Sequence, residues 1–264
     1  MKYAMFLSIV CMMYPSLWTQ GISQTKKTSA FHLIAHRGGV VDSSIEENSM
    51  RALQRAFKRG YWMVEIDVRT TKDGVLITSH DASLKRQFGA DKLVTDMTWE
   101  EINKLQNCIG NKVLKLEEVL AYCSGKLQVM IDNKIKGNDT ALFNRLLQLL
   151  KKYNLQKEAL MIGTDESTEF FTGKIKLSCT RRQLEENKKR SDYSAANYYL
   201  FGSDISKEDV TWAKDNGIMA IGVLNAWALS SVDRNKQALK AAKALINTGA
   251  TYFQIDSQFE EYFR

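Results

Sequence analysis

The hydrophobic residues of this chain follow two patterns that alternate along the sequence. Short continuous apolar runs, which are typical of buried strands, occupy residues 31–35, 62–68, 127–131, 159–162, 175–179, 198–201, 218–224 and 252–255. Longer stretches with apolar side chains at helical spacing occupy residues 47–59, 140–153, 207–216 and 234–247. These stretches predict amphipathic helices, and Gly60 is placed to end the first of them.

Strands that alternate with helices predict β/α units and a parallel sheet. Seven or eight such units in roughly 240 residues fit a single-domain α/β protein, a (β/α)8 TIM barrel, which typically needs about 250 residues. An open doubly wound sheet is the alternative. No G-x-G-x-x-G motif follows a predicted strand, so the dinucleotide-binding version of that fold lacks its fingerprint.

The run at 62–68 continues into a predicted hairpin. Residues 71–74, with the sequence TKDG, form the expected turn, and residues 75–79 form the return strand. Because side chains alternate along a strand, Glu65 and Asp67 share one face of it. Two carboxylates this close repel each other, and a cation bound between them would remove the repulsion.

Barrel enzymes carry their catalytic groups at the C-terminal ends of the strands. Glu65 and Asp67 lie near the end of one predicted strand, and Asp132 directly follows another. Carboxylate oxygens are the ligands that Ca²⁺ and Mg²⁺ prefer. The three acids therefore predict a site for one divalent cation, Ca²⁺ or Mg²⁺. The alternative is a polar strand face that water solvates.

The three histidines of the chain are His32, His36 and His80, and the last two end predicted strands beside these acids. A histidine titrates at about pH 6.5, so two of them can divide the acid and base roles of one reaction. Arg37 and Lys134 are cations at the same barrel end. This set predicts a site for a phosphate ester. His32 begins its strand, and we expect it at the surface or the barrel bottom, without a role.

The N-terminal segment differs from the rest of the chain. Residues 1–23 contain one charged residue, Lys2, an apolar run over 3–14 and small residues from 19 onward. The run is shorter than the roughly 20 residues of a membrane-spanning helix. We therefore expect a signal peptide at 1–23, one domain at 24–264, and export to the periplasm or the medium. An uncleaved membrane anchor is the alternative.

Composition restricts the possible partners. The net charge is +7, and the basic residues are scattered without interleaved aromatic residues, so we expect no nucleic acid partner. A mild positive charge suits an anionic small molecule or peripheral contact with a lipid surface, and no obligate protein partner is indicated. Beyond residue 23 the cysteines are Cys108, Cys123 and Cys179, without a C-x-x-C motif. Three free, buried thiols are expected, and one disulfide is the alternative.

Several motifs occur in order over about 50 residues, which is more specific than any one of them. They are His36-Arg37-Gly38, Glu46-Glu47-Asn48-Ser49, Glu65-x-Asp67, the turn at 71–74, His80-Asp81 and Leu84-x-Arg86. In this order they resemble the glycerophosphodiester phosphodiesterase family. Weaker similarity continues through KLEEVL at 115–120, MIDNKIK at 130–136 and GATYFQID at 249–256.

The resemblance implies a TIM barrel that cleaves glycerophosphodiesters to glycerol 3-phosphate and an alcohol. It implies that His36 and His80 are the acid/base pair, and that Arg37 and Lys134 contact phosphate. It also implies that a cation is held by the three acids, Glu65, Asp67 and Asp132. Three further residues are expected to support the site, namely Glu47, Asn48 and Asp81.

Two departures from the family pattern concern the site. Asp132 stands where the family usually has the longer glutamate, so the cation or the strand must shift. Residues 222–225 read GVLN where the family often has Trp-Thr-Val-Asn, and Trp227 could replace the missing aromatic ring. The sequence thus predicts a metal-dependent glycerophosphodiesterase. The alternatives are a phospholipase D-like enzyme acting on lysophospholipids and a non-catalytic barrel that binds a phosphate ligand.

Overall fold

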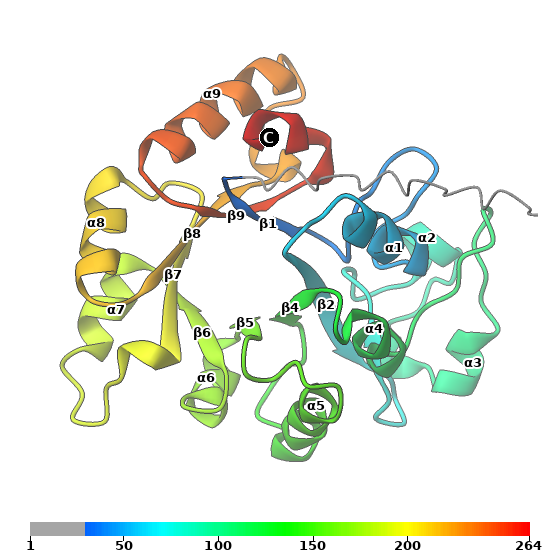
Figure 1. The fold of residues 1–264 in the computed structure, drawn as a ribbon. Helices are drawn as coiled ribbons and strands as arrows, with labels where there is room; N and C mark the ends of the chain where they lie inside the picture. Colours follow the sequence, from blue (N-terminus) through cyan, green and yellow to red (C-terminus); the bar gives the residue numbers. More distant parts are fainter. Residues whose placement is uncertain (1–29) are drawn as a thin grey trace, which may run out of the picture.

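The computed structural model describes residues 30–264, so the predicted signal peptide at 1–23 lies outside the described residues. In the described part, eight parallel strands form a closed barrel, as the alternating pattern predicts, and helices surround it (Figure 1). The strands are β1 (His32–Ala35), β2 (Met63–Thr70), β4 (Gln128–Asn133), β5 (Leu160–Ile162), β6 (Lys176–Cys179), β7 (Tyr198–Gly202), β8 (Met219–Leu224) and β9 (Tyr252–Ile255). The pairing of β1 with both β2 and β9 closes the ring and excludes the open-sheet alternative.

The outer layer consists of the helices that connect successive strands. They are α1 (Met50–Lys58), α4 (Leu116–Cys123), α5 (Thr140–Lys152), α6 (Asp165–Phe171), α7 (Arg181–Asn187), α8 (Lys207–Asp215) and α9 (Arg234–Asn247). A 3-10 helix, η4 (Ser257–Phe263), follows β9 and packs beside α9 (Figure 1). The short helices α6 and α7 were not predicted, because each is only about two turns long and shows little periodicity.

The predicted hairpin is confirmed. Strand β3 (Leu76–Thr78) pairs antiparallel with β2, with Val68 opposite Thr78. The chain then forms α2 (Lys85–Phe88), η1 (Val94–Asp96) and α3 (Trp99–Asn103) before it reaches α4. This insertion has an apolar core of its own, formed by Ile77, Leu84, Val94, Met97, Ile102 and Val113. The core holds β3 in place, and with it the residue pair that follows this strand, His80-Asp81.

Alternation along β2 separates two environments. Val64, Ile66 and Val68 point outward into the core between the barrel and the helices. Met63 points into the barrel, where an apolar layer also includes Ile34, Met130, Leu160, Tyr199 and Ile221. Glu65 and Asp67 have the same inward orientation as Met63 and lie further along the strand. The apolar layer therefore forms the floor beneath the two carboxylates.

The apolar spacing predicts that the first helix begins at Glu47, but α1 begins at Met50. Ser49 is its N-cap, with an extended backbone and a hydroxyl that accepts the Ala52 N–H at 3.2 Å. Asn48 has a left-handed backbone (φ 52°). Glu47 and Asn48 therefore precede the helix, and their side chains are free to turn toward the barrel end.

The cysteine prediction is partly wrong. Cys108, Cys123 and Cys179 are free thiols, but Cys108 is exposed because it lies in the loop after α3. Burial raises the pKa of Cys123 to about 12 and that of Cys179 to about 11. No helix within residues 30–264 has the length and apolar character needed to span a membrane.

Candidate active site

The chain reverses tightly where β1 ends, and this turn brings His36 and Arg37 over the barrel. Arg37 and Gly38 both have left-handed backbones, with φ values of 54° and 78°. The Arg37 backbone N–H donates to Glu65 Oε2 at 2.7 Å, and the Gly38 N–H donates to the Glu65 carbonyl at 2.6 Å. A side chain at Gly39 would meet the Ala52 carbonyl oxygen at 2.3 Å. The turn is therefore fixed against both β2 and α1.

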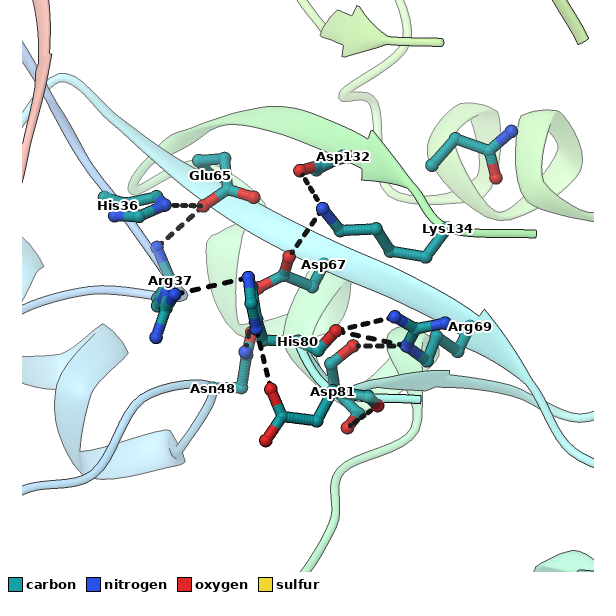
Figure 2. A network of polar contacts seen from close by, with 12 residues as sticks. His36, Arg37, Asn48, Glu65, Asp67, Arg69, His80, Asp81, Asp132 and Lys134 are labelled. Atoms are coloured by element: carbon teal, nitrogen blue, oxygen red, sulfur yellow. Dashed lines mark hydrogen bonds and ion pairs between the residues drawn. The ribbon is translucent and has the colours of Figure 1, made fainter. Parts of the chain in front are cut away.

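The three predicted metal ligands meet at one point. Each of Glu65, Asp67 and Asp132 offers an oxygen, and these oxygens lie within 4.8 Å of one another. Register brings them together, because Asp67 and Asp132 are directly opposite each other on β2 and β4. Glu65 and Asp67 are each only 1% exposed. Figure 2 shows the three acids on adjacent strands, facing the same space.

This concentration of negative charge is electrostatically costly. Burial raises the pKa of Glu65 well above its usual range, and the Asp67 and Asp132 carboxylates raise it further. Burial also raises the pKa of Asp132. Repulsion of this kind favours either protonation of one acid or the binding of a cation.

The donor set fits a hard divalent cation. Glu65 Oε1 and Asp67 Oδ1 are buried and accept no hydrogen bond among the described residues. The second oxygen of each acid accepts a hydrogen bond. Glu65 Oε2 accepts from the Arg37 backbone N–H, and Asp67 Oδ2 accepts from Asn48 Nδ2 at 3.1 Å. One buried oxygen on each acid thus remains directed into the shared space, as coordination by oxygen ligands requires.

Lys134 lies closer to the acids than a purely phosphate-binding role requires. Its Nζ donates to Asp132 Oδ2 at 2.6 Å and lies 3.6 Å from Asp67 Oδ1, between the two carboxylates (Figure 2). Burial lowers the pKa of Lys134, but the Asp132 carboxylate outweighs that effect, so the pKa is raised overall. Lys134 is therefore a permanent cation that balances part of the acidic charge.

His36 is held by an acid that the sequence analysis did not identify. Its Nδ1 donates to Asp256 Oδ1 at 2.6 Å, and its Nε2 lies 3.9 Å from Glu65 Oε2. The other oxygen of Asp256 accepts the Ala226 N–H at 2.6 Å. Burial raises the pKa of Asp256, but the contacts with His36, the Ala226 N–H and Arg37 together lower it below its usual value, so this acid is ionised. Its position was a usable clue, because Asp256 directly follows β9.

His80 has a matching arrangement on the opposite side. Its Nδ1 donates to Asp81 Oδ1 at 2.9 Å, and its Nε2 accepts from Arg37 Nη2 at 3.2 Å. Arg86 pairs with Asp81 Oδ2 at 2.5 Å and lowers the pKa of Asp81 to about 2. Arg69 donates to the His80 carbonyl at 2.7 Å. Both site histidines therefore bind an aspartate through Nδ1 and direct Nε2 toward the acids or Arg37.

Glu47 forms ion pairs with two arginines, Arg37 and Arg86. Its carboxylate lies 2.8 Å from the Arg37 guanidinium. Burial raises the pKa of Glu47, but the hydrogen bonds from these two arginines lower it below its usual value. Glu47 therefore fixes the direction of the Arg37 guanidinium. The sequence analysis named Arg86 in a motif but gave it no role, and it did not select Arg69; the structure shows that they contact Asp81 and the His80 carbonyl.

A pocket of about 380 Å³ opens beside His36, Arg37 and Asp256. Trp227 lines it and is 74% exposed. The loop between β1 and α1 contributes Val41 and Ser43 to its lining. The pocket is continuous with the site and is large enough for a small organic group.

The sequence also matches a known family. The model of the glycerophosphoryl diester phosphodiesterase family matches residues 36–245, most of the chain. The chain belongs to this family. The matched range contains every predicted site residue, and Asp256 lies just beyond it.

Individual relatives agree with this assignment. A glycerophosphodiester phosphodiesterase from Caldanaerobacter subterraneus is 30% identical over 139 residues, which cover 49% of this chain and 56% of the relative. Human lysophospholipase D GDPD1 is 32% identical over 161 residues, 56% of this chain and 48% of that protein. The chain thus spans about half the length of the curated relatives it matches.

A solved structure supports the fold. A glycerophosphoryl diester phosphodiesterase from Parabacteroides distasonis superimposes with a TM-score of 0.70 at 22% sequence identity. The match covers 88% of this chain and 85% of that one. At this identity the likeness concerns the barrel architecture, which agrees with the strand order described above.

Proposed function

We propose that this protein hydrolyses glycerophosphodiesters to glycerol 3-phosphate and an alcohol, with one bound divalent cation, Ca²⁺ or Mg²⁺. The observation that carries the proposal is the buried acidic cluster between two histidines. Glu65 Oε1 and Asp67 Oδ1 accept no hydrogen bond from the part of the chain that the structure describes, and His36 and His80 each have an aspartate on Nδ1. Membership of the family gives the reaction class.

In this proposal the cation would be held by Glu65, Asp67 and Asp132. When bound there, it would polarise the phosphoryl group and offset its developing negative charge. Arg37 would bind a phosphoryl oxygen, since its guanidinium is oriented by Glu47 and contacts His80. Lys134 would contribute positive charge from the side of β4.

The histidines would move the protons. His36 and His80 both keep Nδ1 on an aspartate, so each would exchange its proton through Nε2. One would accept a proton from the attacking hydroxyl, and the other would donate a proton to the leaving alkoxide. If water attacks, the bond from phosphorus to the leaving alcohol breaks and glycerol 3-phosphate forms directly. If the glycerol hydroxyl of the substrate attacks, the same bond breaks and a cyclic glycerol phosphate forms first, which water then opens in a second step. The pocket lined by Trp227 would receive the organic group next to the phosphate.

A phospholipase D-like activity on lysophospholipids is the second candidate. The similarity to human lysophospholipase D GDPD1 favours it, as does the exposed indole of Trp227 beside the site. A non-catalytic phosphate-binding barrel is disfavoured, because such a barrel needs neither of the two aspartate-oriented histidines.

The test is a substrate panel with each cation. Glycerophosphocholine should yield glycerol 3-phosphate in the presence of Ca²⁺ or Mg²⁺, and excess chelator should stop the reaction. His36→Ala and His80→Ala should each lower kcat by about 100- to 10,000-fold while the protein stays folded. Faster turnover of micellar lysophosphatidylcholine than of any soluble diester would favour the second candidate. Full activity in chelator would overturn the role of the cation.

We also propose that the chain is exported, with cleavage after the segment at 1–23, because a short apolar run follows a single lysine there. N-terminal sequencing of protein recovered from the producing cells distinguishes a cleaved chain from an anchored one.

A further inference from the structure

A basic groove lies at the end of the barrel opposite the candidate active site. It has a volume of about 660 Å³ and is formed where the chain enters β5, β6 and β7. Four lysines line it: Lys151, Lys157, Lys174 and Lys176. Lys151 lies at the end of α5, Lys157 and Lys174 lie in the loops that precede β5 and β6, and Lys176 is the first residue of β6. Each of these segments lies at the N-terminal end of a strand, so the groove faces away from the acidic cluster.

The four lysines have no acidic partners within the described part of the chain. None of their ammonium groups forms an ion pair with a carboxylate of residues 30–264. The Lys174 ammonium lies over the Phe170 ring, 4.2 Å from its centroid, and donates to the Phe170 carbonyl. Glu158 is adjacent to Lys157 in sequence but does not line the groove. The positive charge is therefore available to an external anion.

Aromatic side chains close the same end of the barrel. His32 stacks on Tyr252 with ring centroids 4.6 Å apart, and Trp62 lies 5.1 Å from Tyr252 and 5.5 Å from His32. Trp62 and Tyr252 pack on the apolar barrel floor and remain partly exposed. Rings with an apolar body and a polar edge are favoured where a protein meets the headgroup region of a membrane.

The chain also enters the described part at this end. Residue 30 immediately precedes Phe31 and β1, and the sequence just before it contains Lys26 and Lys27. Cleavage after residue 23, as proposed above, would leave Lys26 and Lys27 in the chain, close in sequence to the start of β1.

From these observations we propose that the N-terminal face of the barrel docks on a bilayer containing anionic phospholipids. The lysine groove and the aromatic cluster belong to strands on opposite sides of the ring, β5 to β7 and β1, β2 and β9. A small phosphate ligand would engage only one of the two features, whereas a flat anionic surface contacts both. Docked in this way, the protein turns its active site away from the bilayer and toward soluble substrates. The proposal does not rest on the proposed catalytic activity.

Vesicle co-sedimentation of the full chain tests the docking. We expect binding to phosphatidylcholine vesicles that contain phosphatidylglycerol to exceed binding to pure phosphatidylcholine, and to fall as salt is added. The triple variant Lys151→Glu/Lys157→Glu/Lys174→Glu should lower the partition coefficient by about 100-fold, since each basic residue near such a surface contributes roughly 1 kcal/mol.

A matched variant controls for net charge. Lys207→Glu/Lys236→Glu/Lys240→Glu carries the same charge change on exposed residues of α8 and α9, none of them in an ion pair with residues 30–264. This variant should bind nearly as well as the parent chain. Any affinity due to the N-terminal segment is common to all three proteins. Equal binding by the groove variant and the control would overturn the proposal, as would a parent chain without preference for the anionic vesicles.

Fluorescence reports the orientation of the docked protein. Brominated acyl chains should quench tryptophan emission of the parent chain on anionic vesicles, and Trp62→Phe should lose most of that quenching. Trp227→Phe, which removes an exposed ring at the opposite end, should retain it. Quenching that depends on Trp227 would mean that the active-site end faces the lipid, contrary to the proposal. Glycerophosphocholine hydrolysis by the groove variant is measured in parallel, so that a loss of vesicle docking can be told apart from a loss of catalytic activity.

Discussion

At the scale of single residues, the site depends on how its ring nitrogens and carboxylate oxygens are shared. His36 and His80 each give Nδ1 to an aspartate, which fixes the ring and leaves Nε2 for chemistry. Glu65 and Asp67 each keep one buried oxygen that receives no hydrogen bond from residues 30–264. The structure brings together both histidines and all three acids that the sequence analysis selected, and it adds Asp256, which that analysis did not select.

Asp256 is expected to act as a positioning residue for His36. Asp256→Asn keeps a hydrogen-bonding group of the same size but removes the charge that faces the ring. We expect kcat to fall by at least about tenfold with KM nearly unchanged, because Asp256 orients the proton-transferring group. Steady-state kinetics with glycerophosphocholine measures both constants.

The exposed Asp215, beside the C-terminus of α8, provides the control. Asp215→Asn makes the same chemical change and should leave kcat unaltered. If Asp256→Asn raised KM and left kcat intact, Asp256 would be a substrate-binding residue and not a positioning residue.

At the scale of elements, turns and caps decide which residues reach the site. The prediction that α1 begins at Glu47 was wrong, because Ser49 caps the helix and Asn48 adopts a left-handed backbone. That local geometry allows Glu47 to reach Arg37 and Asn48 to reach Asp67. Hydrophobic periodicity reflects only the positions of apolar side chains. It therefore did not show that Glu47 and Asn48 lie before the helix and contact the site.

The turn after β1 should tolerate no side chain at Gly39. A methyl group there would lie 2.3 Å from the Ala52 carbonyl oxygen, which is backbone and cannot move independently of α1. We expect Gly39→Ala to lower the free energy of unfolding by more than about 2 kcal/mol. The variant should also lose activity, because the turn orients His36 and Arg37. Urea denaturation and the diester assay measure the two effects.

Gly125→Ala is the matched comparison. Gly125 also has a positive φ, 69°, but no atom lies within 4 Å of its added methyl group. Only the backbone strain of about 1 kcal/mol should remain, with full activity. Equal destabilisation by both substitutions would show that the contact with Ala52 is unimportant.

At the scale of the whole molecule, the barrel brings together side chains from distant parts of the sequence. The site combines β1, β2, β4 and β9 with the β3 hairpin, and the closing contact between β1 and β9 brings Asp256 next to His36. The same closure separates the two barrel ends, with acids at one and, at the other, lysines that form no ion pair within residues 30–264.

Cation binding should therefore stabilise the entire domain. Burial, together with repulsion between the carboxylates, raises the pKa of Glu65 and Asp132 in the folded protein, and a bound cation would relieve the repulsion. At a cation concentration 100 times its Kd, we expect Tm to rise by roughly 5–10 °C. Differential scanning fluorimetry with Ca²⁺, Mg²⁺ and chelator measures the shift.

Asp132→Asn removes one of the three carboxylates and should abolish most of this rise in Tm. Asp215→Asn, far from the cluster in sequence and exposed, should respond like the parent chain. A parent protein whose Tm is the same in cation and in chelator would contradict a cation site at this cluster.

The sequence by itself determined the barrel and the inward acids, because side-chain alternation and the order of strands and helices are local patterns. It also identified His36, His80 and Asp132, since each directly follows a predicted strand. Only the tertiary structure decided that Asp256 binds His36, that Arg86 and Arg69 hold the His80 region, and that Lys134 lies between two acids. The contacts of Asp256 and Lys134 depend on ring closure and strand register, which join residues far apart in sequence and leave no periodic trace in it. Arg86 and Arg69 are close to His80 in sequence, but α2 and the hairpin direct their side chains toward it.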